Sequence, residues 1–295
     1  MPTGHDRNGW QAAAFGPHDA AFARVVRGLR PTIAGLVYGL LASVAVASPL
    51  FENSVVSNDI DFIMTSDPAV PACVRYLGPM DKEMPGALDS SDLMARDVFT
   101  FDVTFLDGSQ VGIWVHPSVG SREGAEALAN QLLGPLGRLP AVMRQRLSHV
   151  VVHSGYHAAF GEHLGHFFVL YADNMQARIG THDLEETVFH ETVHATLDAD
   201  WSQSAEWLRA QQTDGAFITE YAAEKPDGED LAETALFALT YLRHRDRLPA
   251  EVVRGVETMI PARVAVFEKI FAAPEPDLSG AERPQDCLVA ATAQG

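Results

Sequence analysis

The stretch THDLEETVFHETVHATLDA, residues 181–199, has the apolar spacing of a helix that packs on one side. Its apolar residues Leu184, Val188, Val193 and Leu197 recur at intervals close to one helical turn. An aspartate directly before the first apolar residue is typical of a helix N-cap. We therefore predict a helix that begins near Asp183 and is capped by that aspartate.

The same helix carries the pentapeptide HETVH, residues 190–194. Residues four apart share a helix face, so His190 and His194 are expected to project side by side, close enough to hold one metal ion. Glu191 lies about 100° further round the axis, where it faces the water that such a metal binds. HExxH on a helix is typical of a zinc site in which the glutamate is the general base. The alternative is a chance match in a chain with 12 histidines.

A catalytic zinc site needs a third protein ligand. Asp200 is one candidate, because it stands where a metzincin-type extended motif has its third ligand, but the motif that it resembles has a turn-forming glycine where this chain has Leu197. The other candidate is a helix expected to start after Asp227, a predicted N-cap, because it places Glu229 and Glu233 on one face. We predict that Glu229 binds the zinc and that Glu233 accepts a hydrogen bond from the ring N–H of a histidine ligand. The reverse assignment stays open.

Two further residues are candidates for roles beside the metal. Tyr221 lies eight residues before Glu229, and its phenol can donate to the oxyanion of a tetrahedral intermediate. The alternative for Tyr221 is an ordinary half-buried tyrosine. Asp198 follows His194 by four residues and can accept a hydrogen bond from the N–H of that ring. The alternative for Asp198 is a solvated acid near a helix end.

The rest of the chain predicts an α+β fold. Residues 48–95 are rich in Pro, Ser, Asp and Met and are expected to form an irregular lead-in, which is also a candidate pro-segment. Residues 96–275 are expected to form one domain, and residues 276–295 a C-terminal tail. The expected elements are a hairpin over 98–115 around Asp107-Gly108, a helix capped by Ser121, a short helix over 141–147, strands in HVVVHSG and HFFVLYAD, and helices over 229–242 and 249–271.

The N-terminus has the pattern of an export signal. Three arginines, the last of them Arg30, precede an uncharged apolar run from about Ile33 to Ala47 that ends in small residues. The run is shorter than the roughly 20 residues of a membrane-spanning helix. We expect residues 1–47 to be a cleaved signal peptide and the mature protein to be secreted or periplasmic. The alternative is an uncleaved anchor, which would be the chain's contact with a membrane.

The charge of the chain disfavours nucleic-acid binding. The formal net charge is −18, and removal of residues 1–47, with four arginines and two aspartates, moves it to −20. Phosphate backbones would repel such a protein. In an exported protein the two cysteines, Cys73 and Cys287, are expected to form one disulfide, with two free thiols as the alternative.

With HETVH, Tyr221 and the helix start EDLAE at residues 229–233, the chain resembles gluzincin-type zinc peptidases. More narrowly it resembles the group related to the catalytic domain of anthrax lethal factor, over about residues 150–242. The resemblance implies a zincin-like fold, in which a small mixed sheet packs on the HExxH helix and further helices follow. It also implies that HFFVLYAD, residues 166–173, is the edge strand along which an extended peptide would bind. The site residues that it implies are the zinc ligands His190, His194 and Glu229, the base Glu191 and the oxyanion donor Tyr221.

The function predicted from these features is an exported zinc metalloendopeptidase. In this reaction Glu191 activates a zinc-bound water that attacks a peptide bond of a peptide or protein substrate. The alternative is a non-catalytic exported domain that binds zinc, or a partner, on a peptidase-like scaffold. The sequence specifies neither the cleavage preference nor the oligomeric state.

Overall fold

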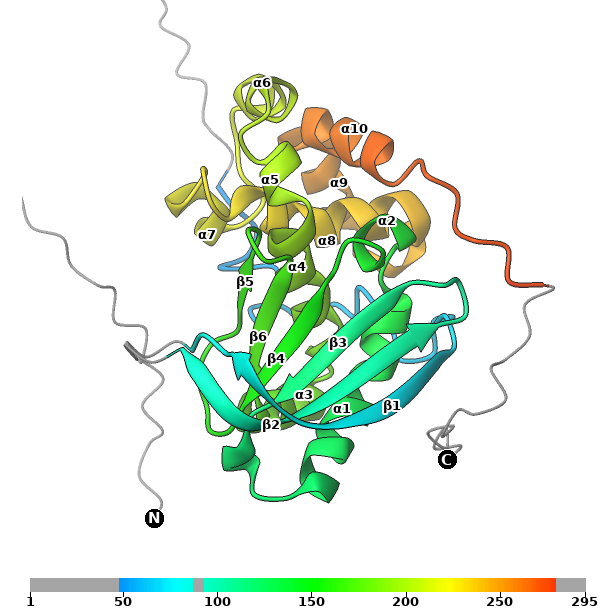
Figure 1. Ribbon diagram of the computed structural model, residues 1–295. Helices are drawn as coiled ribbons and strands as arrows, with labels where there is room; N and C mark the ends of the chain where they lie inside the picture. Colours follow the sequence, from blue (N-terminus) through cyan, green and yellow to red (C-terminus); the bar gives the residue numbers. More distant parts are fainter. Residues whose placement is uncertain (1–47, 87–92, 280–295) are drawn as a thin grey trace, which may run out of the picture. The chain divides into compact units, whose positions relative to one another are not determined.

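The computed structural model describes residues 48–86 and 93–279 (Figure 1). In this part of the chain, a six-stranded mixed sheet is combined with about ten helices, as the α+β prediction requires. The predicted signal segment, Cys287 and most of the predicted tail lie outside the described residues. Cys73 lies in the first strand and is not a free thiol, but its pairing with Cys287 stays a prediction.

The sheet combines antiparallel and parallel strands in the order β1-β2-β3-β4-β6-β5. The three strands at one end pair antiparallel, β4 joins β3 and β6 in parallel, and β5 pairs antiparallel with β6. The chain between the parallel strands β3 and β4 is helical, whereas the chain between the parallel strands β4 and β6 contains only the short strand β5. The strands are β1 (Ala72–Glu83), β2 (Met94–Phe105), β3 (Gln110–Val115), β4 (His149–His153), β5 (Phe160–Glu162) and β6 (Phe167–Tyr171).

The predicted hairpin is confirmed and is part of a longer meander. Strands β2 and β3 pair antiparallel on either side of Asp107-Gly108, with Phe101 opposite Ile113. The turn between them is stabilised by Asp107, whose Oδ1 accepts the Ser109 N–H at 3.0 Å. Within the predicted lead-in, residues 48–71 form only an isolated bridge, whereas β1 is a regular strand of 12 residues that pairs with β2.

The helices pack mainly against one face of the sheet and against each other (Figure 1). α1 and α4 contact the strands, and α8 packs on α4. None of the helices in the described part of the chain has the length and apolar character that crossing a bilayer requires. The α-helices are α1 (Arg122–Arg138), α2 (Ala141–Arg144), α3 (Ala172–Thr181), α4 (Leu184–Thr196), α5 (Asp198–Trp201), α6 (Ala205–Asp214), α7 (Glu220–Glu224), α8 (Asp230–Arg243), α9 (Ala250–Met259) and α10 (Pro261–Ile270).

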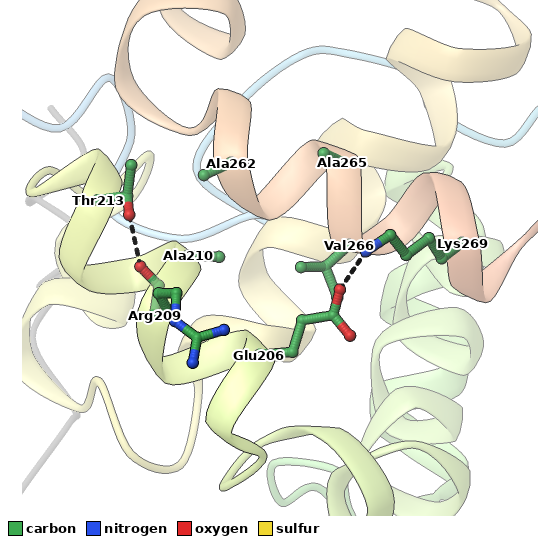
Figure 2. Close-up of a pocket in the computed structure, with 8 residues that line it drawn as sticks. All are labelled: Glu206, Arg209, Ala210, Thr213, Ala262, Ala265, Val266 and Lys269. Atoms are coloured by element: carbon green, nitrogen blue, oxygen red, sulfur yellow. Dashed lines mark hydrogen bonds and ion pairs between the residues drawn. The ribbon is translucent and has the colours of Figure 1, made fainter.

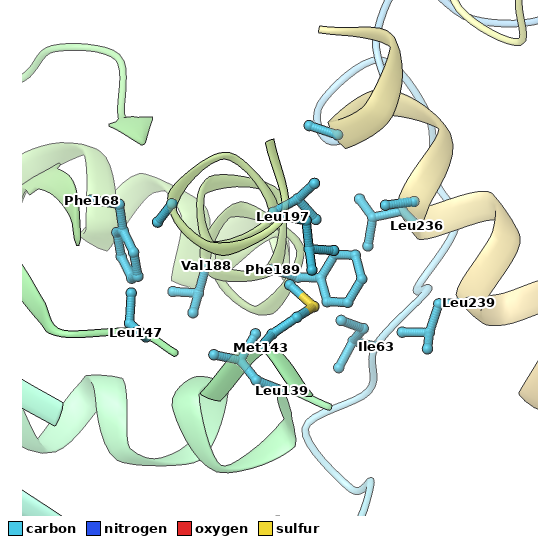
Figure 3. Packing of buried hydrophobic residues seen from close by; sticks show 14 of the residues in the cluster. Ile63, Leu139, Met143, Leu147, Phe168, Val188, Phe189, Leu197, Leu236 and Leu239 are labelled. Carbon is cyan, nitrogen blue, oxygen red and sulfur yellow. The ribbon is translucent and has the colours of Figure 1, made fainter. Parts of the chain in front are cut away.

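Helix α4 is the centre of the hydrophobic core. Its side chain Phe189 is fully buried and faces the side chains of three other segments (Figure 3). On the sheet side, Val188 lies beside Phe168 of β6. A helix buried on nearly all sides holds its polar residues in fixed positions, because close packing leaves few alternative rotamers. The neighbours of Phe189 are Ile63 of the N-terminal segment, Met143 of α2, and Leu236 of α8.

The expectation that HFFVLYAD is the edge strand is wrong. β6, which contains most of it, lies between β4 and β5, and β5 is the strand at that end of the sheet. β5 has only three residues, Phe160-Gly161-Glu162, and all three are half-buried. Such a short segment shows no alternation, so the sequence gives no periodic signal for it.

The predicted helix over 249–271 is two helices. α9 ends at Met259 and α10 begins at Pro261, with Ile260 between them in a non-helical conformation. Proline lacks the N–H that a continuing helix needs, and its ring would clash with a preceding carbonyl. Proline at the first position of a new helix removes both problems.

The predicted caps differ in outcome. Ser121 caps α1 as expected, because its Oγ accepts the Gly124 N–H at 3.1 Å. Asp183 does precede α4, but its side chain makes no capping bond and instead accepts from the Thr181 hydroxyl. Asp227 does not cap α8, since that helix begins at Asp230 with Glu229 in the N-cap position.

Candidate metal site

His190, His194 and Glu229 meet in one group that can hold a metal ion. The Nε2 atoms of the two histidines are 3.3 Å apart. Glu229 Oε2 lies 3.2 Å from Nε2 of His194 and 3.6 Å from Nε2 of His190. All three ligand atoms therefore surround one common point, and the three side chains are largely buried.

The two helices that meet at this point explain the arrangement. α4 presents both imidazoles because their positions are one turn apart. Glu229 belongs to a turn in which its N–H bonds the Lys225 carbonyl at 2.9 Å, immediately before α8. α8 packs directly on α4 through its apolar side, so Glu229 is carried to the histidine face.

Each imidazole also has an acidic neighbour at its other nitrogen. Nδ1 of His194 is 2.8 Å from Oδ2 of Asp198, one turn further along the chain. Nδ1 of His190 is 3.7 Å from Oε1 of Glu233. An acid at Nδ1 fixes the tautomer that leaves Nε2 free to bind a metal.

The alternative third ligands lie elsewhere. Asp200 forms an ion pair of 2.6 Å with Arg146 and is exposed, so it is not part of the group. Glu233 faces the Nδ1 side of His190 rather than the Nε2 side. Among the described residues, Glu229 is the carboxylate that completes the group.

The carboxyl groups around the site have different electrostatic environments. Burial by itself would raise the pKa of Glu229, but the hydrogen bonds to His190 and His194 hold it well below its usual value. Burial raises the pKa of Glu191, and the attraction of the histidine charges only partly offsets this effect. The Glu191 side chain is buried beside the two histidines. Opposite shifts in neighbouring acids are typical of sites where one acid binds and the other transfers a proton.

Tyr221 touches the group through Glu229. Its hydroxyl donates to Glu229 Oε1 at 3.0 Å and accepts from the Lys225 ammonium at 2.9 Å. The residue lies on α7, whose hydroxyl cap is Thr219. The phenol is thus held one hydrogen bond away from a candidate metal ligand.

Strand β5 packs directly on this face of α4. A Cβ atom added to Gly161 would lie 2.5 Å from both the Glu191 carbonyl oxygen and the Cβ of His194. A side chain at residue 161 would therefore force the strand and the helix apart. Sequence reasoning missed β5, and Gly161 is the residue that allows its close approach.

Two more contacts at the site have no signal in the sequence pattern. Ser54 bonds to Glu233, and Lys225 bonds to Tyr221. Of these two partners, only Lys225 lies near a predicted site residue in the sequence. Ser54 is 179 residues from its partner, so no local spacing can reveal it.

A separate groove lies between α6 and α10 (Figure 2). The Glu206–Lys269 ion pair joins its two walls, and the Thr213 hydroxyl donates to the Arg209 carbonyl oxygen at 2.7 Å. Its other lining residues are Ala210, Ala262, Ala265 and Val266. None of these residues belongs to the metal group, and we assign the groove no function.

No protein-family model matches the chain, and comparisons with curated proteins and with solved structures found no match either. The function must therefore be inferred from the residues of the site.

Proposed function

We propose that this protein is an exported zinc-dependent metallopeptidase. The observation that carries the proposal is the three-residue group of His190, His194 and Glu229 with the buried Glu191 directly beside it on α4. Two imidazoles and one carboxylate are a ligand set of catalytic zinc sites, which keep a fourth position open.

The distances support zinc as the ion. Ligand atoms that lie 2.0–2.1 Å from a tetrahedral zinc are about 3.3–3.4 Å apart. The three separations in this group are 3.3, 3.2 and 3.6 Å. Imidazole nitrogen also favours zinc over the oxygen-seeking ions calcium and magnesium.

The composition of the group supports a catalytic role over a structural one. Structural zinc sites are usually closed by four protein ligands and often use cysteine. Within the described residues, only three side chains make up the group, and no cysteine is among them. Cys73, in β1, is not a free thiol and is therefore unavailable as a ligand.

The proposed reaction divides the work between Glu191 and Tyr221. Zinc, when bound, lowers the pKa of a water molecule toward about 7 and polarises the substrate carbonyl. The Glu191 carboxylate accepts a proton from the attacking water and passes it to the nitrogen of the leaving amine. The Tyr221 phenol donates to the carbonyl oxygen as that oxygen gains negative charge.

The proposed substrate is a peptide or protein segment in extended conformation. β5 lies at the end of the sheet and packs on the face of α4 that carries Glu191 and His194. Its outer edge offers backbone groups with which an extended peptide can pair. The net charge of −18 disfavours nucleic acid as a substrate. The N-terminal signal pattern supports export, so the proposed location of the reaction is outside the cytoplasm. An uncleaved N-terminus would be the membrane contact.

The variant Glu191→Gln tests the proposal, because Gln keeps the shape of the side chain but cannot take the proton. We expect the variant to keep about one zinc per chain. We expect its hydrolysis of a broad peptide library to fall by about 10²–10⁴-fold. Glu251→Gln, at an exposed position of α9, is the matched control and should keep full activity.

Undiminished hydrolysis by Glu191→Gln would overturn the proposed mechanism. Zinc binding by the wild type without hydrolysis of any library peptide would favour the non-catalytic zinc-binding alternative. A chelator should abolish wild-type hydrolysis, and zinc should restore it.

A further inference from the structure

Residues 48–57 reach the candidate metal site from a direction that neither α4 nor α8 supplies. Three backbone hydrogen bonds of 2.9–3.0 Å join residues 50–52 to residues 218–221, and Phe51 forms a parallel bridge with Thr219. The segment is thereby fixed against the turn that leads into α7. This docking brings Ser54, a fully buried residue, to the N-terminal end of α8, where Glu233 lies.

Ser54 binds both oxygens of the Glu233 carboxylate. Its N–H donates to Oε2 at 2.7 Å, and its hydroxyl donates to Oε1 at 3.1 Å. A carboxylate held at both oxygens cannot rotate, so its position relative to α4 is fixed.

The same serine hydroxyl lies beside a candidate metal ligand. Ser54 Oγ is 3.5 Å from Nδ1 of His190, and Glu233 Oε1 is 3.7 Å from the same nitrogen. A hydroxyl can accept one hydrogen bond and donate another. Ser54 can therefore accept from the His190 Nδ1–H while it donates to Glu233.

We infer that Ser54 is a positioning residue of the metal site, which orients the His190 ring through its hydroxyl and through Glu233. The inference rests on the proposed function, because it assumes that His190 binds the metal. The His194 ring is oriented without a distant segment, because Asp198, four residues further along the chain, contacts its Nδ1 directly at 2.8 Å. Residues 48–57 are then part of the finished site and not a segment to be removed on activation.

The test compares zinc affinity in Ser54→Ala and Ser57→Ala. Ser54→Ala removes the hydroxyl but keeps the backbone N–H that bonds Glu233, so the segment stays docked. Ser57→Ala removes a hydroxyl of the same segment that bonds only within the local turn, to Asn53. Competition with a chromophoric chelator gives the zinc dissociation constant. We expect it to rise about 10-fold in Ser54→Ala and to stay at the wild-type value in Ser57→Ala.

A double variant separates positioning from a general loss of structure. If Ser54 and Glu233 orient the same His190 ring, the rise in the dissociation constant of Ser54→Ala/Glu233→Gln should be smaller than the product of the two single rises. The visible spectrum of bound Co²⁺ should also change in Ser54→Ala, because the spectrum reports ligand geometry.

Hydrogen exchange of the wild-type protein gives a readout that needs no variant to fold. If the hydrogen bonds of Ser54 strengthen zinc binding, zinc binding strengthens those hydrogen bonds by the same free energy. Zinc should therefore slow the exchange of the Ser54 amide hydrogen with solvent. An unchanged exchange rate, equal zinc affinities of wild type and Ser54→Ala, or equal weakening in Ser54→Ala and Ser57→Ala would each overturn the inference alone. Absence of zinc binding by the wild type would instead overturn the proposed function, and the inference with it.

Discussion

The two histidines of the candidate site are supported in different ways. His194 and its partner Asp198 lie within five consecutive residues, so the contact follows from helix geometry. His190 depends on Glu233 and Ser54, which come from α8 and from the N-terminal segment. We call His194 with Asp198 the local half of the site, and His190 with Glu233 and Ser54 the assembled half, because the latter forms only when distant segments pack. The geometry of the local half should therefore be less sensitive than that of the assembled half to substitutions in distant segments.

The largest expected effect on stability follows from removal of the buried ion pair that holds the start of α8, the helix that carries Glu233. Arg263 is fully buried and pairs with Asp230, the first residue of α8, and with Asp214. Arg263→Met would leave both aspartates buried and unpaired. We expect the free energy of unfolding to fall by about 3–5 kcal/mol in urea denaturation.

The control for this variant is Arg245→Met, which breaks an exposed ion pair with Glu257. Exposed pairs contribute about 0–1 kcal/mol, so this variant should unfold near the wild-type midpoint. Equal destabilisation by the two substitutions would contradict the role assigned to the buried pair.

The next effect concerns Glu186, a buried acid on α4 that ties the helix to the N-terminal segment. Its Oε1 accepts the Ile63 N–H at 2.9 Å, and burial raises its pKa to about 8. Between pH 4.5 and 8 the unfolded chain ionises this group while the folded protein keeps it protonated. Stability should therefore fall as pH rises through this window, by up to about 5 kcal/mol.

Glu186→Gln isolates this contribution, because glutamine keeps the acceptor for Ile63 but does not ionise. The difference in unfolding free energy between wild type and variant should change across pH 4.5–8 and be constant above it. A difference that is the same at pH 4.5 and pH 8 would refute the assignment of the slope to Glu186.

A smaller effect tests the local half of the site. Asp198→Ala removes the acid at Nδ1 of His194, and we expect the zinc dissociation constant to rise about 10–100-fold. Asp200→Ala is the matched control on the same short helix, since its carboxylate pairs with Arg146. A larger loss in Asp200→Ala would return Asp200 to consideration as the third ligand.

The contrast between the halves also explains what the sequence could predict. The α4 helix, the β2–β3 hairpin and the Ser121 cap follow from local spacing, and each is present. The i, i+4 relation of Glu229 and Glu233 indicated that both acids face one way, before any packing was known.

Other features have no local cause. β5 is three residues long, and its place at the edge depends on the space that Gly161 leaves above α4. Ser54 reaches Glu233 only because residues 50–52 dock beside residues 218–221. The split at Pro261 did have a local signal, because proline inside a helical pattern indicates a break.

The most direct test of the metal site is elemental analysis of zinc in residues 48–295, for the wild type and for Glu229→Ala. We predict about one zinc per chain in the wild type. We predict that this zinc is lost or much more weakly held in the variant, because the carboxylate that completes the group is gone. Zinc held equally well by Glu229→Ala would contradict the assembled site, and no zinc in either protein after reconstitution would contradict the metal site altogether.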